Sequence, residues 1–468
     1  MSTEPPTAPA GAPAARKQKR RARWFIAGLI LVPLATFAVF LYSLTLDEPP
    51  PGIGDLTTPP PHYNPSATHC FNNAIIAMEP LYPRELHGGK YMNEVGEMEY
   101  GEKWHPQVAA ELFAAADKNN LWESFDKALE APDELNDWGG TSKGVLYFIN
   151  LARFIKLHAF HQSRIGDHGG AIHSALQIIE FGGKIENNEY STLRLLAGCS
   201  AKAIGVDTLG EVLKACGSIT APDARSWCER LSSRQPDLEK IIPLAMRAEV
   251  VFNVNLVSPS PYIYVTIIDA PYSRLLEKIY FKPNQTLRLI AENTRARMAG
   301  VGPYFSSCKE LATRLAPELE RQCRRRSPFD IVNKDGRAVV QMIFEGDLST
   351  MRRYYAVKSL VSAAQAGLAA RAYEHDHGEL PGTLDALVPA YLPAVPIDYM
   401  DGRPIRYSKA ERAVWTIGPD NLAAPLPPVP ATRSDHTEDE EPIFRLDHRP
   451  RPPAEPPPAA GRPDTPAP

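Results

Sequence analysis

A run of 23 residues without a charged side chain, Trp24–Leu46, constrains the fold of this chain more than any other feature. A helix of that length rises about 34 Å, which is enough to cross a hydrocarbon core of about 30 Å. Trp24 and Tyr42 lie near its two ends, where amphipathic rings favour the membrane interface. Asp47 and Glu48 follow it directly. The sequence therefore predicts one transmembrane helix over residues 24–46, held in a lipid bilayer.

The charges beside this run predict its orientation. Six basic side chains lie within residues 1–23, and cytoplasmic flanks carry an excess of Lys and Arg. We therefore expect residues 1–23 to form a basic cytoplasmic tail, the inner (cytoplasmic) membrane to hold the anchor, and the rest of the chain to lie outside the cytoplasm. A cleaved signal peptide has a shorter apolar region followed by small residues, whereas this run ends Tyr-Ser-Leu-Thr-Leu. An uncleaved anchor is favoured over a signal peptide or a buried core helix.

Proline marks the remaining boundaries. Of 46 prolines, four lie in residues 1–15, seven in 47–65 and fourteen in 422–468. Proline-rich linkers are extended and semi-rigid, so residues 47–65 are expected to form a stalk. Residues 422–468 are rich in proline and charge, which predicts a disordered tail. Between these segments the sequence indicates an exported α-helical domain, 66–373, and a small module, 374–421.

Apolar side chains at helical spacing predict a mainly α-helical body. Residues 145–162 form one such pattern, Gly166-Asp167 interrupts it, and residues 171–181 resume it, which resembles a single tetratricopeptide-type hairpin. The repeat period of about 34 residues is not continued. The expected fold is therefore mainly α, with an irregular helical-hairpin body, a small α+β hairpin module after it and one transmembrane helix before it. Further helices are predicted over residues 190–216, 222–233, 236–256, 284–299 and 338–373.

All six cysteines follow the apolar run, at positions 70, 199, 216, 228, 308 and 323. An even number in an exported domain permits disulfides. The pairs nearest in sequence, Cys216–Cys228 and Cys308–Cys323, are the first candidates. The alternative is that several of these residues are buried as small apolar side chains. Because no C-x-x-C pair is present, neither a zinc knuckle nor a thioredoxin-type redox pair is expected.

In the module at 374–421, prolines and glycines interrupt regular secondary structure. Two short β-prone runs, 404–408 and 413–417, predict a hairpin there. Its ordered positions are Gly378, Leu380-Pro381, Leu384, Leu387-Val388-Pro389, Tyr391-Leu392, Pro396, Asp398, Gly402, Tyr407 and Gly418-Pro419-Asp420. This order resembles the C-terminal half of the G-type major pseudopilins of type II secretion. Over residues 66–421 the chain also resembles a group of membrane-anchored helical proteins of unknown role from planctomycete and verrucomicrobial bacteria.

The resemblance implies an α+β module and, in pseudopilins, calcium in the last loop. Asp420 best matches that position, and Asp398 and Asp401 are the further carboxylates nearby. Calcium takes about six to eight oxygen ligands, so this set is incomplete, and a capped hairpin end is the alternative. The anchor begins Arg23-Trp24-Phe25-Ile26, without the glycine and Phe-Thr-Leu-Ile-Glu of a prepilin-peptidase site. Assembly into a pilus is therefore not expected.

Candidate catalytic side chains gather around one turn. His158 and His161 share a helix face, His168 and His173 follow the turn, and Asp167 lies between them. Imidazole and carboxylate are the ligand types of zinc sites, and the alternative is a set of exposed histidines. Two further polar groups are expected to be solvated surface, namely Arg324-Arg325-Arg326 and the cluster Glu374, His375, Asp376, His377 and Glu379.

The chain has no H-E-x-x-H, P-loop or G-x-G-x-x-G motif. No catalytic, cofactor-binding or metal residue is assigned, and no cofactor is expected. The net charge of −4 argues against a nucleic-acid partner. The sequence predicts a non-enzymatic, single-pass extracytoplasmic protein that serves the cell envelope as a structural or protein-interaction component, with an envelope protein as partner. The alternative is a metal-dependent envelope hydrolase using the His158–His173 cluster.

Overall fold

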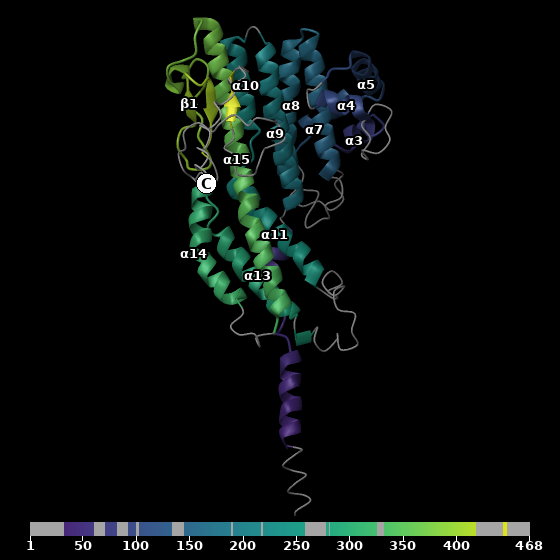
Figure 1. Cartoon of the computed structure of the whole chain (residues 1–468), viewed down its shortest axis with the longest axis vertical. Coiled ribbons are helices and arrows are strands. Elements are labelled where there is room, and N and C mark those ends of the chain that lie inside the picture. Colours follow the sequence, from purple (N-terminus) through teal and green to yellow (C-terminus); the bar gives the residue numbers. More distant parts are fainter. Residues whose placement is uncertain are drawn as a thin grey trace, which may run out of the picture. The chain divides into compact units, whose positions relative to one another are not determined.

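The computed structural model describes residues 32–59, 71–81, 92–99, 103–132, 145–188, 191–216, 219–257, 278–279, 281–324, 332–417 and 443–446. Over these residues the chain is mainly α-helical, with one small antiparallel sheet (Figure 1). It divides into two compact units, each described here by itself. The first unit comprises Met1–Gly52, Leu256–Ile290 and Glu320–Met342, and the second comprises Ile53–Asn255, Ala291–Leu319 and Ile343–Pro468.

Each helix predicted from apolar spacing is confirmed, and further helices precede and follow them. The labelled helices are α2 (Gly54–Thr57), α3 (Asn72–Met78), α4 (Met92–Glu99), α5 (Pro106–Lys118), α6 (Leu121–Glu130), α7 (Val145–Arg164), α8 (His168–Asn188), α9 (Thr192–Ala215), α10 (Ala221–Ser233), α11 (Leu238–Val257), α13 (Pro283–Met298), α14 (Phe305–Cys323) and α15 (Lys334–His377), with a short 3₁₀ turn, η2 (Leu384–Leu387). The mainly α fold class is therefore confirmed for the described residues.

A tight turn joins α7 to α8, where the sequence places Gly166-Asp167. Gly166 has a φ of 86°, a conformation that a side chain would strain. Asp167 then caps α8, because its Oδ1 accepts the backbone N–H of Gly170 at 2.9 Å. The two helices and α9 lie side by side in the second unit (Figure 1). The predicted helical hairpin at residues 145–181 is thus present.

Glycines bring α8 and α9 unusually close together. A Cβ added at Gly182 would lie 2.5 Å from the carbonyl oxygen of Gly198, and one added at Gly205 would lie 2.9 Å from the backbone nitrogen of Ile179. Only hydrogen fits in these gaps. One buried ion pair crosses the same interface, between Lys202 Nζ and Glu186 Oε2 at 2.6 Å. The pairing of α8 with α9 therefore combines backbone approach with an internal charge contact.

Local capping explains where α10 and α11 begin. Thr220 accepts the backbone N–H of Asp223 at 3.3 Å and donates its hydroxyl to the Asp223 carboxylate at 2.6 Å, which is a reciprocal cap. Asp237 accepts the backbone N–H of Glu239 at 3.1 Å. Both acidic residues follow a proline in the sequence. The first turn of each helix is thus held by a side-chain oxygen.

The sheet consists of β1 (Arg406–Ser408), β2 (Ala413–Trp415) and β3 (Ile443–Arg445) in the order β1-β2-β3, all antiparallel. The predicted hairpin of the terminal module corresponds to β1 and β2. The strand β3 corrects the prediction that residues 422–468 are disordered throughout. Phe444 and Leu446 are only 3% and 2% exposed, because these two apolar side chains enter the core even though the surrounding composition is proline-rich and charged. The rest of that tail lies outside the described residues.

None of the described cysteines forms a disulfide, which corrects both suggested pairings. Cys308 and Cys323 lie towards the two ends of the single helix α14, so about 22 Å of helix separates them, far beyond the reach of a disulfide. Cys216 and Cys228 are buried separately in the same apolar core. Burial raises the pKa of the Cys228 thiol to about 12. Cys199, Cys216, Cys228 and Cys308 are buried as small apolar side chains are, whereas Cys323 is half-buried. Cys70 lies outside the described residues.

The expected stalk differs from a free polyproline spacer over residues 47–59. In the second unit, Leu56 is 1% exposed, and the Asp55 carboxylate binds the Arg295 guanidinium at 2.8 and 2.6 Å. In the first unit, Glu48 binds Arg288 Nε at 2.6 Å. Glu48 and Asp55 thus each have a cationic partner, which proline content alone does not reveal. Residues 60–65 lie outside the described residues.

Residues 32–45 form a helix, drawn in purple in Figure 1. Its apolar side chains are exposed on every face, as Val32 (64%), Phe37 (58%) and Val39 (67%) illustrate. Among the described helices, none is both long enough and apolar enough to cross a membrane. Residues 24–31, the first part of the predicted span, lie outside the described residues.

Candidate functional site

The predicted histidine cluster does not assemble into one site. His158 on α7 lies among aromatic rings, with its centroid 4.1 Å from the stacked ring of Trp122 and 5.2 Å from that of Phe113. Burial lowers the pKa of His158 to about 4, because desolvation disfavours the imidazolium. This side chain is therefore a neutral member of an aromatic cluster.

The other histidines also contact rings or charged side chains. The ring of His161 lies 5.1 Å from Phe113 and 6.2 Å from Trp104, centroid to centroid, and His173 Nδ1 lies 3.1 Å from Arg230 Nη1. His168 stands at the start of α8, where the carboxylate of Asp167 is used as a helix cap. In the described part of the chain no group of three His, Cys, Asp or Glu side chains is placed to hold a metal ion.

The low pKa of His158 gives a pH prediction. An unfolded histidine titrates near 6.5, so between about pH 4 and 6.5 the unfolded chain binds more protons than the folded one, and stability rises with pH there. Acidification from pH 7 to 4 should cost about 2–3 kcal/mol through this residue, with no effect above pH 7. His158→Phe should remove that loss, because phenylalanine keeps the stack on Trp122. Urea unfolding midpoints of both proteins at pH 7 and 4.5 check this, and equal pH slopes would contradict it.

Two of the three carboxylates suggested for calcium are occupied by an arginine. Asp398 is fully buried, and both it and Asp401 form ion pairs with the guanidinium of Arg406. Backbone N–H groups of Met400 and Ile417 also donate to Asp398, each at 2.9 Å. The fixed cation and these donors satisfy the carboxylates from within the chain. Asp420 lies outside the described residues, so the calcium interpretation remains a prediction.

The polar cluster around residue 374 is only partly a solvated surface. Glu374 accepts from Arg412 Nη2 at 2.8 Å and also binds Arg371, and Asp376 accepts the Tyr391 hydroxyl at 2.8 Å. Glu379, His375 and His377 are exposed, and Glu379 pairs with Lys409 at 2.8 Å. These contacts hold the terminal module to the end of α15. Of the basic run, Arg324 pairs with Glu320 at 3.7 Å, and positions 325–326 lie outside the described residues.

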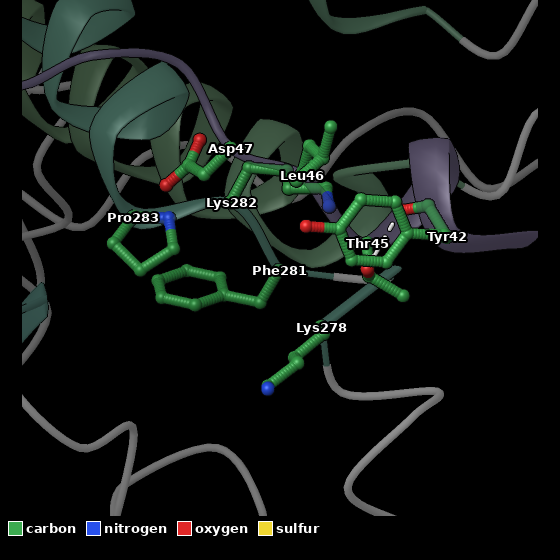
Figure 2. Close-up of a pocket in the computed structure, with 8 residues that line it drawn as sticks. All are labelled: Tyr42, Thr45, Leu46, Asp47, Lys278, Phe281, Lys282 and Pro283. Carbon is green, nitrogen blue, oxygen red and sulfur yellow. Dashed lines mark hydrogen bonds between the residues drawn. The ribbon is translucent and has the colours of Figure 1, made fainter. Parts of the chain in front are cut away.

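A partly open pocket lies in the first unit, where helix 32–45 ends (Figure 2). Its volume is about 380 Å³. Lys282 Nζ donates to the carbonyl oxygen of Leu44 at 2.6 Å, and burial lowers the pKa of Lys282. Lys278 is exposed beside it. The lining residues are Tyr42, Thr45, Leu46, Asp47, Lys278, Phe281, Lys282 and Pro283.

The start of α13 binds Asp47 and Glu48, which follow the helix 32–45. The Asp47 carboxylate accepts the N–H groups of Asn284 at 2.8 Å and Gln285 at 3.3 Å, so it satisfies two donors at the positive end of that helix. The carbonyl oxygen of Glu48 accepts Asn284 Nδ2 at 2.7 Å. We call this set of contacts, together with Lys282 to Leu44 and Arg288 to Glu48, the anchor clamp.

The anchor clamp contains cations, carboxylates and amides, and the pocket beside it adds the aromatic rings of Tyr42 and Phe281. Among these described residues no nucleophile is paired with a base. The chemistry of the clamp suits holding one segment and contacting polar groups, rather than catalysis. Sequence reasoning missed it because residues 42–48 and 278–288 are far apart in the chain, and neither segment carries a recognisable motif. The two acidic residues after the apolar run were the one available signal.

Comparisons with protein-family models, with curated proteins and with solved structures found no match to this chain.

Proposed function

We propose that the protein is a single-pass membrane-anchored component of the cell envelope, with residues 24–46 in the bilayer and the helical body outside the cytoplasm. The observation that carries this proposal is the exposure of the helix 32–45. Its apolar side chains point in all directions, including Leu34 (56% exposed), Phe37 (58%) and Phe40 (55%). A helix that is apolar all round is stable when buried, in a protein core or in lipid, and no core formed by the described residues covers this one.

The anchor clamp supports the same function. It follows the apolar helix immediately and fixes residues 44, 47 and 48 through backbone and charged contacts. Tyr42, 65% exposed, stands where an amphipathic ring meets the headgroup region. These contacts join the end of the helix to the start of α13, as an anchor that holds a domain at a membrane surface requires.

Within this proposal the body serves protein interaction or structure, and its partner is another envelope protein. The contacts of the histidines give no specific support to the metal-dependent hydrolase alternative, which stays an untested prediction. The likenesses to pseudopilins and to tetratricopeptide hairpins likewise remain predictions. Zinc bound stoichiometrically to the purified protein, and lost in His161→Ala, would favour the hydrolase.

Membrane extraction tests the anchor. The wild-type chain should remain in the membrane pellet after an alkaline carbonate wash, whereas a Leu34→Lys, Phe37→Lys, Phe40→Lys triple variant should appear in the supernatant. Each lysine at the centre of a span costs about 2.5–3.5 kcal/mol of insertion free energy. The matched control is Ile76→Lys, which charges an equally exposed apolar side chain (65%) on α3 and should stay in the pellet. Wild-type protein found in the wash would contradict the proposal.

Orientation has its own test. A reporter enzyme that is active only outside the cytoplasm, fused after residue 468, should be active in the wild-type chain because six basic side chains precede the anchor. Exchanging these residues for glutamine should lower reporter activity. Activity confined to a reporter that works only in the cytoplasm would overturn the orientation while leaving the anchor itself intact.

A further inference from the structure

The strand β3 occupies a groove that the rest of the second unit builds for it. Its residues pair with the edge of β2 in the register Ala413↔Arg445, Val414↔Phe444 and Trp415↔Ile443. One further backbone contact extends this ladder, since Leu446 N–H donates to the Arg412 carbonyl oxygen at 2.9 Å. The segment is therefore bound as an extended peptide is bound when it adds a strand to a sheet.

The aromatic side chain of this segment enters a socket formed by two glycines. A Cβ added at Gly367 on α15 would lie 2.3 Å from the ring of Phe444, and one added at Gly210 on α9 would lie 3.7 Å from the same ring. Phe444 is 3% exposed and Leu446 is 2% exposed. We call the β2 edge together with Gly210 and Gly367 the strand socket. Main-chain contacts give it affinity, and the socket selects an aromatic residue followed two positions later by an aliphatic one.

A long stretch of chain connects β3, which occupies the strand socket, to the preceding strand β2. Twenty-seven residues separate Trp415 from Ile443, a length that spans up to about 90 Å when extended. The strand itself has three residues, so few contacts hold it, and those contacts are the same whichever copy supplies it. Exchange of an identical element between copies is a low-cost route to a dimer.

We propose that the strand socket binds the β3 segment of a second copy of this chain, so that two copies associate by exchanging strands. The occupant is defined by the structure: residues 443–446, with Phe444 between the two glycines and Leu446 following. Competition between the segment of the same chain and that of a neighbour sets the extent of pairing. This inference goes beyond the proposed anchor and does not depend on it.

Complementary defects test the exchange in full-length chains. Gly367→Leu fills the socket but leaves the strand intact, and Phe444→Ala with Leu446→Ala disables the strand but leaves the socket open. The two variants, carrying different tags, are co-expressed, extracted in detergent and captured through one tag. The mixed pair should co-purify about tenfold more than either variant paired with itself, since only the mixed pair has both a free strand and a free socket. Gly382→Leu, at a glycine with open space around it, is the control for Gly367→Leu and should not act as a socket-filled partner.

A second measurement leaves Gly210, Gly367, Phe444 and Leu446 unchanged. One full-length chain carries Ala413→Cys and another carries Arg445→Cys, at positions that are paired across the ladder. After mild oxidation, co-expression should give a disulfide-linked dimer that neither chain gives alone or with unmodified chain. If the mixed pair in the first experiment co-purifies no better than the matched pairs, and no dimer forms in the second, strand exchange is excluded. If either experiment gives the expected result while the wild-type chain is washed off membranes by carbonate, strand exchange is supported and the membrane anchor is not.

Discussion

Replacement of Lys202 by methionine should lower the free energy of unfolding by about 3–5 kcal/mol. The Lys202 and Glu186 side chains are 2% and 3% exposed, and their charged atoms are 2.6 Å apart. The variant leaves the Glu186 carboxylate inside the α8–α9 interface without its cation, where its remaining contact is the Cys199 thiol at 3.4 Å. Urea unfolding of the detergent-solubilised chain, followed by circular dichroism, measures the change.

Two further variants separate the charge effect from a packing effect. Lys202→Met combined with Glu186→Leu should recover most of the lost stability, since removal of both charges of a buried pair is close to neutral or favourable. Lys127→Met breaks an ion pair of similar length, 2.6 Å to Glu123, whose side chains are 72% and 65% exposed, and should change stability far less, because solvent screens an exposed pair. Equal losses in the single and double variants would show that packing dominates.

Gly182→Ala should destabilise the protein by about 1–3 kcal/mol, although alanine is the better helix former. The new methyl group would lie 2.5 Å from the Gly198 carbonyl oxygen and 2.6 Å from Lys202 Cγ. The first of these atoms is backbone, so α8 and α9 must move apart. That movement also stretches the ion pair at Lys202, and we therefore expect the losses from Gly182→Ala and Lys202→Met to be non-additive.

A second glycine of the same helix provides the matched control. Gly169 also lies in α8, and a Cβ there meets nothing within 4 Å. Gly169→Ala should leave stability unchanged or raise it by up to about 1 kcal/mol. The same unfolding experiment measures both variants, and a loss in Gly169→Ala equal to that in Gly182→Ala would refute the close-approach explanation.

Periodicity predicted the helices well where they are long and amphipathic or follow a clear cap. The prediction over residues 222–233 matches α10 (Ala221–Ser233), because Pro222 and Asp223 mark its first turn. The turn at Gly166 was also identified, since glycine followed by aspartate both permits the positive φ and caps the next helix. Local signals of this kind are present in the sequence itself and need no tertiary contact.

Features that depend on distant partners were not predictable. Phe444 and Leu446 belong to a segment whose average composition indicates disorder. The space that the Phe444 ring occupies is left by Gly210 and Gly367, which are far away in the chain. The spacing of His158 and His161 indicated a shared helix face, yet Trp122 and Phe113 decide that this face is aromatic packing. In the sequence Asp47 and Glu48 are charged residues that flank an apolar run. Their contacts with the start of α13 depend on tertiary structure and could not be predicted from the sequence.

The buried thiols have a consequence for producing the protein. Cys199, Cys228 and Cys308 are nearly inaccessible, and the first two have thiol pKa values raised by burial, so neither a reductant nor an alkylating reagent reaches them in the native state. These three cysteines form no disulfide, so folding of the core around them requires no oxidation. Dithiothreitol should therefore leave the thermal unfolding curve unchanged, and recombinant chain refolded under reducing buffer should regain the same helical core.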